Sequence, residues 1–150
     1  MDNDLTQDLF QWVFSDYVPT WAAIGRSERD AKDILNYWSV PMFAASMHGI
    51  GWLMDEEAVI GLLATTHAPL KTSGYDNTKP LDRAITVYND HSASADAIWS
   101  RRRADETEIE RVATHFDIRL TEAGWRIIGL SNQYTQTGRL ADVWASRHGA

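Results

Sequence analysis

The chain has 150 residues, of which 44% are hydrophobic and 23% charged, a composition typical of a folded globular protein with one domain. Its 14 Lys and Arg against 21 Asp and Glu give a net charge of −7, so the charge balance does not favour binding to nucleic acid or to an anionic membrane surface. The absence of cysteine excludes disulfides, a thiol nucleophile and cysteine-bound metals, and without a long apolar run or a secretory signal we expect a cytoplasmic protein with no membrane contact.

The N-terminal part of the sequence has the apolar spacing of helices. Residues 4–25 place apolar side chains every three or four positions, which predicts one amphipathic helix. Pro19 lies within this stripe and removes a backbone donor, so we expect a kink or break near residues 15–19. A second, shorter helix is expected to begin at Ser27.

The next region combines extended segments with a third helix. Residues 37–54 are apolar without helical spacing, and their proline and glycines predict short extended pieces joined by a turn at residues 48–51. Asp55 is well placed to cap the helix that follows. That helix is expected to end before Pro69 or at Gly74.

From about residue 81 the apolar pattern alternates, which predicts an antiparallel meander with one apolar face. The expected strands are residues 83–89, 93–103, 108–120 and 125–131. Residues 1–131 are therefore predicted to form one domain, and residues 132–150 a tail with a candidate helix at 138–147. Helices followed by an antiparallel sheet indicate an α+β fold, with a curved sheet wrapped around the N-terminal helices.

Aromatic residues are abundant, with seven Trp, five Tyr and four Phe, which favours a large core or a lined apolar cavity. Three helices cannot cover a long twisted sheet evenly, so we expect a cone-shaped fold with an interior pocket. By strand alternation Trp99, Thr114, Phe116 and Trp125 point toward it.

Three stretches resemble the nuclear transport factor 2-like superfamily, which includes ketosteroid isomerase, scytalone dehydratase, limonene epoxide hydrolase and polyketide cyclases. They are the helical Asp16-Tyr17-Val18, residues 36–63 with their glycine turn and acidic-capped helix, and residues 108–130 ending in EAGWRIIGL. The resemblance covers about residues 5–131. It implies the cone-shaped fold and a homodimer formed through the open sheet face, whereas the superfamily hosts many unrelated activities.

The resemblance also implies candidate catalytic residues. Tyr17 falls where ketosteroid isomerases place their oxyanion-stabilising tyrosine, and Thr114 falls near their protonated aspartate. Their general-base aspartate would fall within residues 45–48, where His48 is the one side chain able to act as a base. The alternative interpretations are a solvated turn histidine at His48 and a core-packed tyrosine at Tyr17.

Aromatic and polar side chains around these positions are candidates for ligand binding, with core packing as the alternative for each. The candidates are Trp21, Tyr37, Trp38, Trp99, Thr114, Phe116 and Trp125.

Two charged clusters have simpler interpretations. Four alternating side chains, Arg111, His115, Asp117 and Arg119, are expected on the solvent or dimer face; a His–Asp pair within a site would need the opposite register. The arginines at residues 101–103 precede a strand with several glutamates, which predicts cross-strand charge pairing. A phosphate or carboxylate site is the alternative there.

These patterns favour a cofactor-free enzyme that performs acid–base chemistry on a hydrophobic small molecule, of the isomerase, dehydratase, cyclase or epoxide hydrolase type. The alternatives are a non-catalytic ligand-binding or dimerisation domain and an acidic adaptor for a protein partner. The sequence has no metal-ligand spacing, glycine-rich phosphate loop or G-x-S-x-G motif, so neither a metal nor a cofactor is expected.

Overall fold

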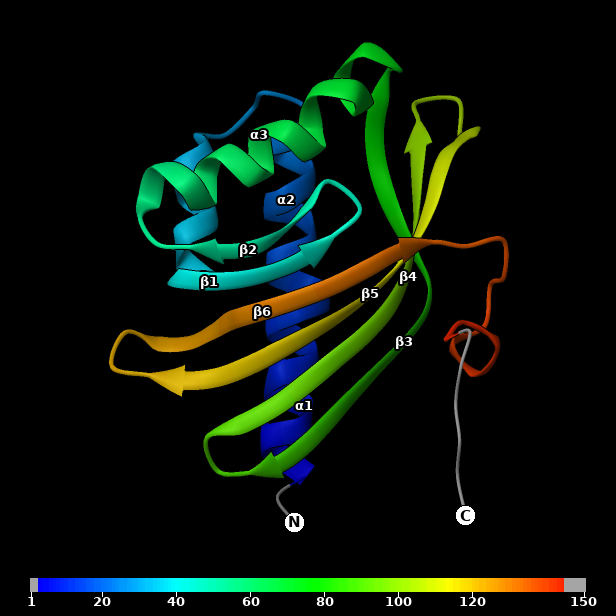
Figure 1. Cartoon of the computed structure of the whole chain (residues 1–150). Helices are drawn as coiled ribbons and strands as arrows, with labels where there is room; N and C mark the ends of the chain where they lie inside the picture. Colours follow the sequence, from blue (N-terminus) through cyan, green and yellow to red (C-terminus); the bar gives the residue numbers. More distant parts are fainter. Residues whose placement is uncertain (1–2, 145–150) are drawn as a thin grey trace.

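A computed structural model describes residues 3–144 and shows a curved sheet wrapped around an N-terminal helical segment (Figure 1). The apolar stripe of residues 4–25 forms α1 (Asn3–Gln11), η1 (Trp12–Tyr17) and α2 (Val18–Gly25) in direct succession. The expected irregularity is a π-helical turn, η1, instead of a break. Pro19 lies in the first turn of α2, directly after this π-helical turn.

The short helix expected from Ser27 begins later and has a different form. Ser27 adopts a positive φ of 62°, which directs the chain away from α2. A 3-10 helix, η2 (Ala31–Asn36), then begins after Asp30, whose side chain accepts a hydrogen bond from the backbone N–H of Lys32. The start predicted at Ser27 is therefore wrong, and Asp30 is the residue that caps this helix.

The extended pieces form a hairpin of β1 (Trp38–Ser46) and β2 (Gly49–Leu53), followed by α3 (Glu56–Thr72). Asp55 caps α3 as predicted, since its Oδ1 accepts from the N–H of Ala58 at 2.8 Å. Pro69 lies inside α3, so the helix continues past it and ends just before Gly74, whose φ is 85°.

Four long strands follow as the predicted antiparallel meander: β3 (Tyr75–Asn89), β4 (Ser92–Arg103), β5 (Glu108–Thr121) and β6 (Gly124–Tyr134). β3 begins at Tyr75 instead of residue 83. This first part of β3 belongs to an edge strand with register shifts, where Pro80 is tolerated and strict apolar alternation is not required. β6 continues to Tyr134 instead of ending at residue 131.

The six strands form one sheet in the order β2-β1-β6-β5-β4-β3, and the sheet is mixed because β1 runs parallel to β6. Its concave face packs on the helices, and α3 crosses one end of the sheet (Figure 1). Between these layers lies a core whose members are almost completely buried. They include Leu9, Val13, Ile34, Met42, Val59, Leu63, Ile118 and Ile127.

The C-terminal tail packs on the convex face of the sheet. Val143 and Leu140 contact Ile98 and Ala113, which alternate with the inward residues of β4 and β5. In place of the candidate helix at 138–147 there is a single 3-10 turn, η3 (Leu140–Asp142), and residues 145–147 lie outside the described part of the chain. None of the helices in residues 3–144 is long and apolar enough to span a membrane.

Candidate functional site

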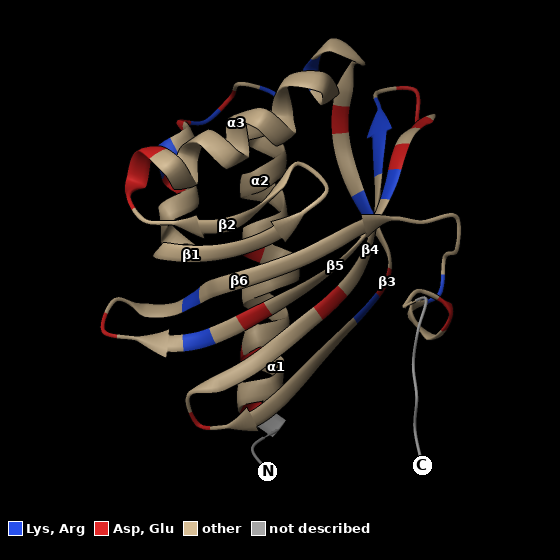
Figure 2. Cartoon of the chain, in the orientation of Figure 1, with Lys and Arg blue, Asp and Glu red and all other residues tan. Residues whose placement is uncertain are grey.

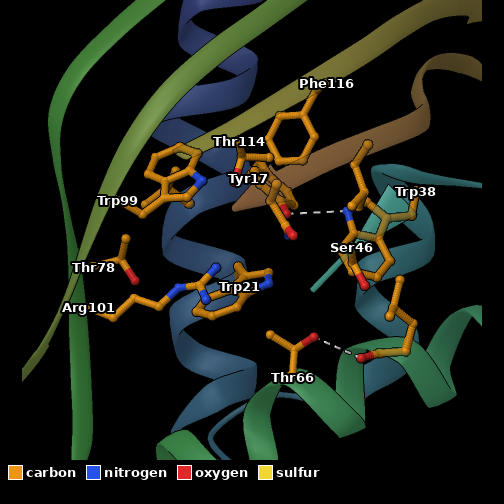
Figure 3. Close-up of a pocket in the computed structure, with 14 residues that line it drawn as sticks. Tyr17, Trp21, Trp38, Ser46, Thr66, Thr78, Trp99, Arg101, Thr114 and Phe116 are labelled. Carbon is orange, nitrogen blue, oxygen red and sulfur yellow. Dashed lines mark hydrogen bonds between the residues drawn. The ribbon is translucent and has the colours of Figure 1, made fainter. Parts of the chain in front are cut away.

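A pocket lies between the helices and the concave face of the sheet (Figure 3). Its volume is about 40 Å³, which accommodates a few water molecules or a small ligand. Side chains from the N-terminal helical segment, from α3 and from five strands line it. They are Tyr17, Val18, Trp21, Trp38, Ser46, Leu62, Thr66, Thr78, Trp99, Arg101, Thr114, Phe116, Leu130 and Asn132.

Two spacing rules bring these residues together. Tyr17 and Trp21 are four residues apart on the helical segment, so they lie on one face of it. On β4 and β5, alternate residues share a face, and the pairing of Ala97 with Thr114 keeps the inward positions of the two strands in register. Thr114 pairs in turn with Asn132 of β6, so the polar end of the pocket spans three neighbouring strands.

Tyr17 is a buried hydrogen-bond donor at the pocket. Its hydroxyl accepts a hydrogen bond from Nε1 of Trp38 at 3.2 Å, and its ring packs edge-on against Phe116. Burial raises the pKa of Tyr17 far above its ordinary value, so the phenol stays protonated at neutral pH. Among the described residues no acceptor takes its proton, which is therefore free for a bound molecule.

Arg101 brings a positive charge to the pocket from β4. The side chain is buried, with Nη1 donating to Oε2 of Glu110 at 2.6 Å and the guanidinium carbon 4.5 Å from the ring centre of Trp21. Figure 3 shows it reaching across Trp21, opposite Trp38 in this view. Its Nε atom is buried without a hydrogen-bond partner in the described structure.

Thr114 presents a second unsatisfied polar atom. Its side chain is 3% exposed, and its Oγ1 has no hydrogen-bond partner among the described residues. A buried hydroxyl without a partner is unusual because folding removes its hydrogen bonds to water. Arg101 and Thr114 thus give the pocket two polar atoms that the fold leaves unpaired.

His67 lies behind the pocket on α3 and does not line it. Its ring packs against Trp21 with centroids 4.2 Å apart, and its Nε2 is also buried without a partner. Burial, with smaller contributions from the charges of Arg101 and Lys71, lowers the pKa of His67 to about 4. Gly25 leaves room for this packing, because a Cβ there would lie 2.9 Å from the ring of Tyr75 and 3.2 Å from Nε2 of His67.

Six of the predicted site residues line the pocket, and three do not. Those that line it are Tyr17, Trp21, Trp38, Trp99, Thr114 and Phe116. Tyr37 is buried beside Thr20, with 3.3 Å between the two hydroxyl oxygens, and Trp125 packs at the edge of the core. His48 is exposed in the β1–β2 turn beside a separate surface groove, so a base at His48 would act from outside this pocket.

Arg101 was considered only as part of a separate anion site at residues 101–103, and His67 was not singled out, although the positions of both follow from patterns in the sequence. Arg101 is two residues after Trp99 on β4, so alternation places it on the inward face. His67 continues the buried spacing of Val59 and Leu63 on α3. At both positions the spacing of buried residues predicts an apolar side chain, and the sequence has a polar one.

The convex face carries the charged side chains predicted for it, and His115 is paired with two carboxylates there. Nδ1 of His115 lies 2.8 Å from Asp96 and Nε2 lies 3.5 Å from Asp117. The hydrogen bond that Nδ1 of His115 donates to the Asp96 carboxylate raises the pKa of His115. Figure 2 shows acidic and basic segments on neighbouring strands of this sheet.

The cross-strand pairing with glutamate predicted for the arginines at residues 101–103 is confirmed for Arg101, whereas Arg103 donates to the carbonyl of Ser73 and to Thr107. Arg101 pairs with Glu110, and Arg102 lies 3.4 Å from Glu106. Within residues 3–144 no group of three or more His, Asp or Glu side chains is arranged to hold a metal ion.

Solved structures with the same fold come from several bacteria. An NTF2-like protein with a cystatin-like fold from Novosphingobium aromaticivorans is 21% identical, with a TM-score of 0.63 over 93% of this chain and 84% of that one. A domain of unknown function from Nostoc punctiforme is 13% identical, with a TM-score of 0.66 over 91% and 81%. An NTF2-like protein of unknown function from Pseudomonas putida is 12% identical, with a TM-score of 0.64 over 88% and 87%.

These similarities show the fold and not an activity, and no curated protein sequence matches the chain significantly. The sequence itself matches the family described as NTF2-like protein (DUF6841) over residues 7–135. This match spans the helical segment, the hairpin, α3 and the whole meander. The helices packed in a curved mixed sheet, the pocket between them and the family match together place the chain in the NTF2-like (DUF6841) family.

Proposed function

We propose that the protein binds a small molecule in the pocket between its helices and the concave face of its sheet. The observation that carries this proposal is the pair of buried polar atoms without partners, Nε of Arg101 and Oγ1 of Thr114. Each such atom costs about 1–3 kcal/mol of folding free energy unless something pairs with it. A ligand that supplies hydrogen-bond acceptors would recover that cost when it binds.

The surrounding walls fit a ligand with an apolar body. Trp21, Trp99 and Phe116 present aromatic surface, and a few polar groups converge between them, which is the usual composition of a small-molecule site. The small volume favours a compact ligand over one the size of a steroid. We therefore place ligand binding ahead of the other functions that the fold allows.

A second candidate is a cofactor-free enzyme that polarises its substrate through Tyr17. The protonated, buried phenol is suited to stabilise a developing oxyanion, a role in which a single donor contributes roughly 10²–10³-fold to kcat. The lining residues include no Asp, Glu or His, so a general base would have to come from the substrate or from outside the pocket. This candidate therefore predicts an isomerisation or elimination that depends on Tyr17 and persists in a His48→Gln variant.

The ligand-binding proposal is tested by thermal-shift screening of small, oxygen-bearing aliphatic compounds, the size that suits a pocket of about 40 Å³. A ligand at 100 times its Kd stabilises the protein by about 2.7 kcal/mol, which raises the Tm by several degrees. Thr66 and Thr72 provide a matched pair of variants, because both hydroxyls on α3 donate to the carbonyl one turn earlier, but Thr66 lines the pocket and Thr72 is exposed.

Thr66→Phe fills the pocket and is expected to abolish the shift, whereas Thr72→Phe should keep it. Absence of binding by every compound, or equal binding by the Thr66→Phe variant, would contradict the proposal. The native protein and the Tyr17→Phe variant are then compared in turnover assays, with each compound that binds as the substrate. A kcat unchanged by loss of the hydroxyl would remove the enzymatic candidate.

A further inference from the structure

We infer that the ligand of this pocket is a compact monocarboxylate whose oxygens pair with Arg101, Thr114 and Tyr17. The inference rests on the ligand-binding function proposed above and specifies the chemical class of the ligand. Three features of the pocket support it: its charge, its excess of donors and the way in which the guanidinium is held.

The charge of the lining is positive. Arg101 is the one ionised side chain among the lining residues, which include no Asp or Glu. Glu110 pairs with Nη1 from the neighbouring position on β5 and leaves Nε without a partner. A single guanidinium that shares its charge with Glu110 suits a monoanion and not a phosphate dianion, which needs several cationic donors.

Among the lining residues, hydrogen-bond donors outnumber acceptors. The Nε–H of Arg101 and the hydroxyls of Thr114 and Tyr17 have no acceptor in the described structure. Asn132 uses its Oδ1 to accept from the backbone N–H of Met47, so its amide donors remain available. A carboxylate brings acceptors and no donors, and it therefore complements this group.

The guanidinium is fixed before a ligand arrives. The ring of Trp21 lies 4.5 Å from its central carbon, and the 2.6 Å hydrogen bond to Glu110 holds one of its nitrogens. A donor held in this way loses little conformational freedom on binding, which favours recognition of a planar carboxylate. The volume of about 40 Å³ limits the ligand to a short or compact carbon skeleton next to the aromatic walls.

The test compares carboxylates with their neutral amides on the full-length protein. Acetate and propionate are titrated against acetamide and propionamide at constant ionic strength, with calorimetry and tryptophan fluorescence as readouts, because ligands of this size suit a pocket of about 40 Å³. Because a hydrogen bond to a charged group is worth more than one to a neutral group, each carboxylate should bind roughly tenfold or more tightly than its amide. Equal binding of acid and amide would overturn the inference while leaving the ligand-binding function intact.

Three variants locate the effect. Arg101→Met should remove the preference for carboxylate over amide, and Thr114→Val should weaken carboxylate binding roughly three- to tenfold without changing the volume of the side chain. Arg102→Met removes the neighbouring arginine, which pairs with Glu106 outside the pocket lining, and should bind as the native protein does. If Arg101→Met does not fold, the acid–amide comparison and Thr114→Val still decide the question.

The outcomes separate the two proposals. Binding of neutral compounds alone, or a carboxylate preference that survives in Arg101→Met, overturns the carboxylate inference. Failure of every compound, charged or neutral, overturns the ligand-binding function and with it the inference. Tighter carboxylate binding that depends on Arg101 and Thr114, and not on Arg102, supports both.

Discussion

The two faces of β5 differ in how their polar groups are satisfied. On the convex face His115 lies between the carboxylates of Asp96 and Asp117. On the concave face, the hydroxyl of Thr114, one residue away, and Nε of Arg101 on the adjacent strand have no hydrogen-bond partner within residues 3–144. The fold itself pairs the charged groups on the convex face. The two polar atoms on the concave face have no such partner, and a bound molecule would supply one.

The largest expected effect is at Arg101. Replacing it with Met leaves the mostly buried Glu110 unpaired and removes the cation that packs on Trp21. We expect a loss of about 3–5 kcal/mol of unfolding free energy, as for breaking a buried ion pair from one side. Arg102→Met, which breaks a more exposed pair, should cost less than about 1 kcal/mol. Urea denaturation of both variants measures the difference, and equal losses would show that Arg101 behaves as a surface residue.

The next effect concerns His67. Its folded-state pKa of about 4 is below the ordinary value near 6.5, so the unfolded chain takes up a proton before the native protein does. The contribution of neutral His67 to the unfolding free energy is therefore fully present above pH 6.5. It is lost as the pH falls toward 4, and the total loss is on the order of 3 kcal/mol. Stability curves of the native protein and of His67→Gln should therefore converge with acidification. Parallel curves would show that His67 is already hydrated in the native state.

Much of the pocket follows from strand alternation, and the errors have physical causes. The spacing on β4 and β5 predicted the inward positions of Trp99, Thr114 and Phe116 correctly. The same spacing places Arg101 on the inward face of β4. Because cross-strand pairing with glutamate explained its charge, we did not assign it to the pocket. That pairing is real, yet it involves one nitrogen of a side chain that has three.

Where long-range packing decides, the sequence was less informative. The first part of β3 has no apolar alternation and was therefore not predicted as a strand. It can form nevertheless, because it belongs to an edge strand with register shifts. Trp125 has the expected parity on β6 but lies at the edge of the core and away from the pocket lining. His48 was chosen from a family position, and the hairpin turn places it in solvent.

A smaller effect distinguishes two threonines of β5. Thr114→Val replaces an unpaired buried hydroxyl with a methyl group of the same size, so we expect a gain of up to about 1 kcal/mol. Thr121→Val removes a hydroxyl that donates to the carbonyl of Gly124 at 2.7 Å and should lose about 1 kcal/mol. Thermal unfolding of the two variants gives the signs directly. A loss at Thr114 would mean that its hydroxyl already has a partner in the native protein.

The smallest expected effect is at His115, and its sign is opposite to that at His67. Asp96 raises the folded-state pKa of His115, so the stabilisation is complete below about pH 6.5 and disappears as the pH rises through the raised value. Because the pair is partly exposed, it is worth less than about 1 kcal/mol. In Asp96→Asn the pKa of His115, followed by NMR titration, should fall toward its ordinary value. An unchanged pKa would mean that the 2.8 Å contact does not persist in solution, and the convex face would then lose the feature that separates it from the unsatisfied concave one.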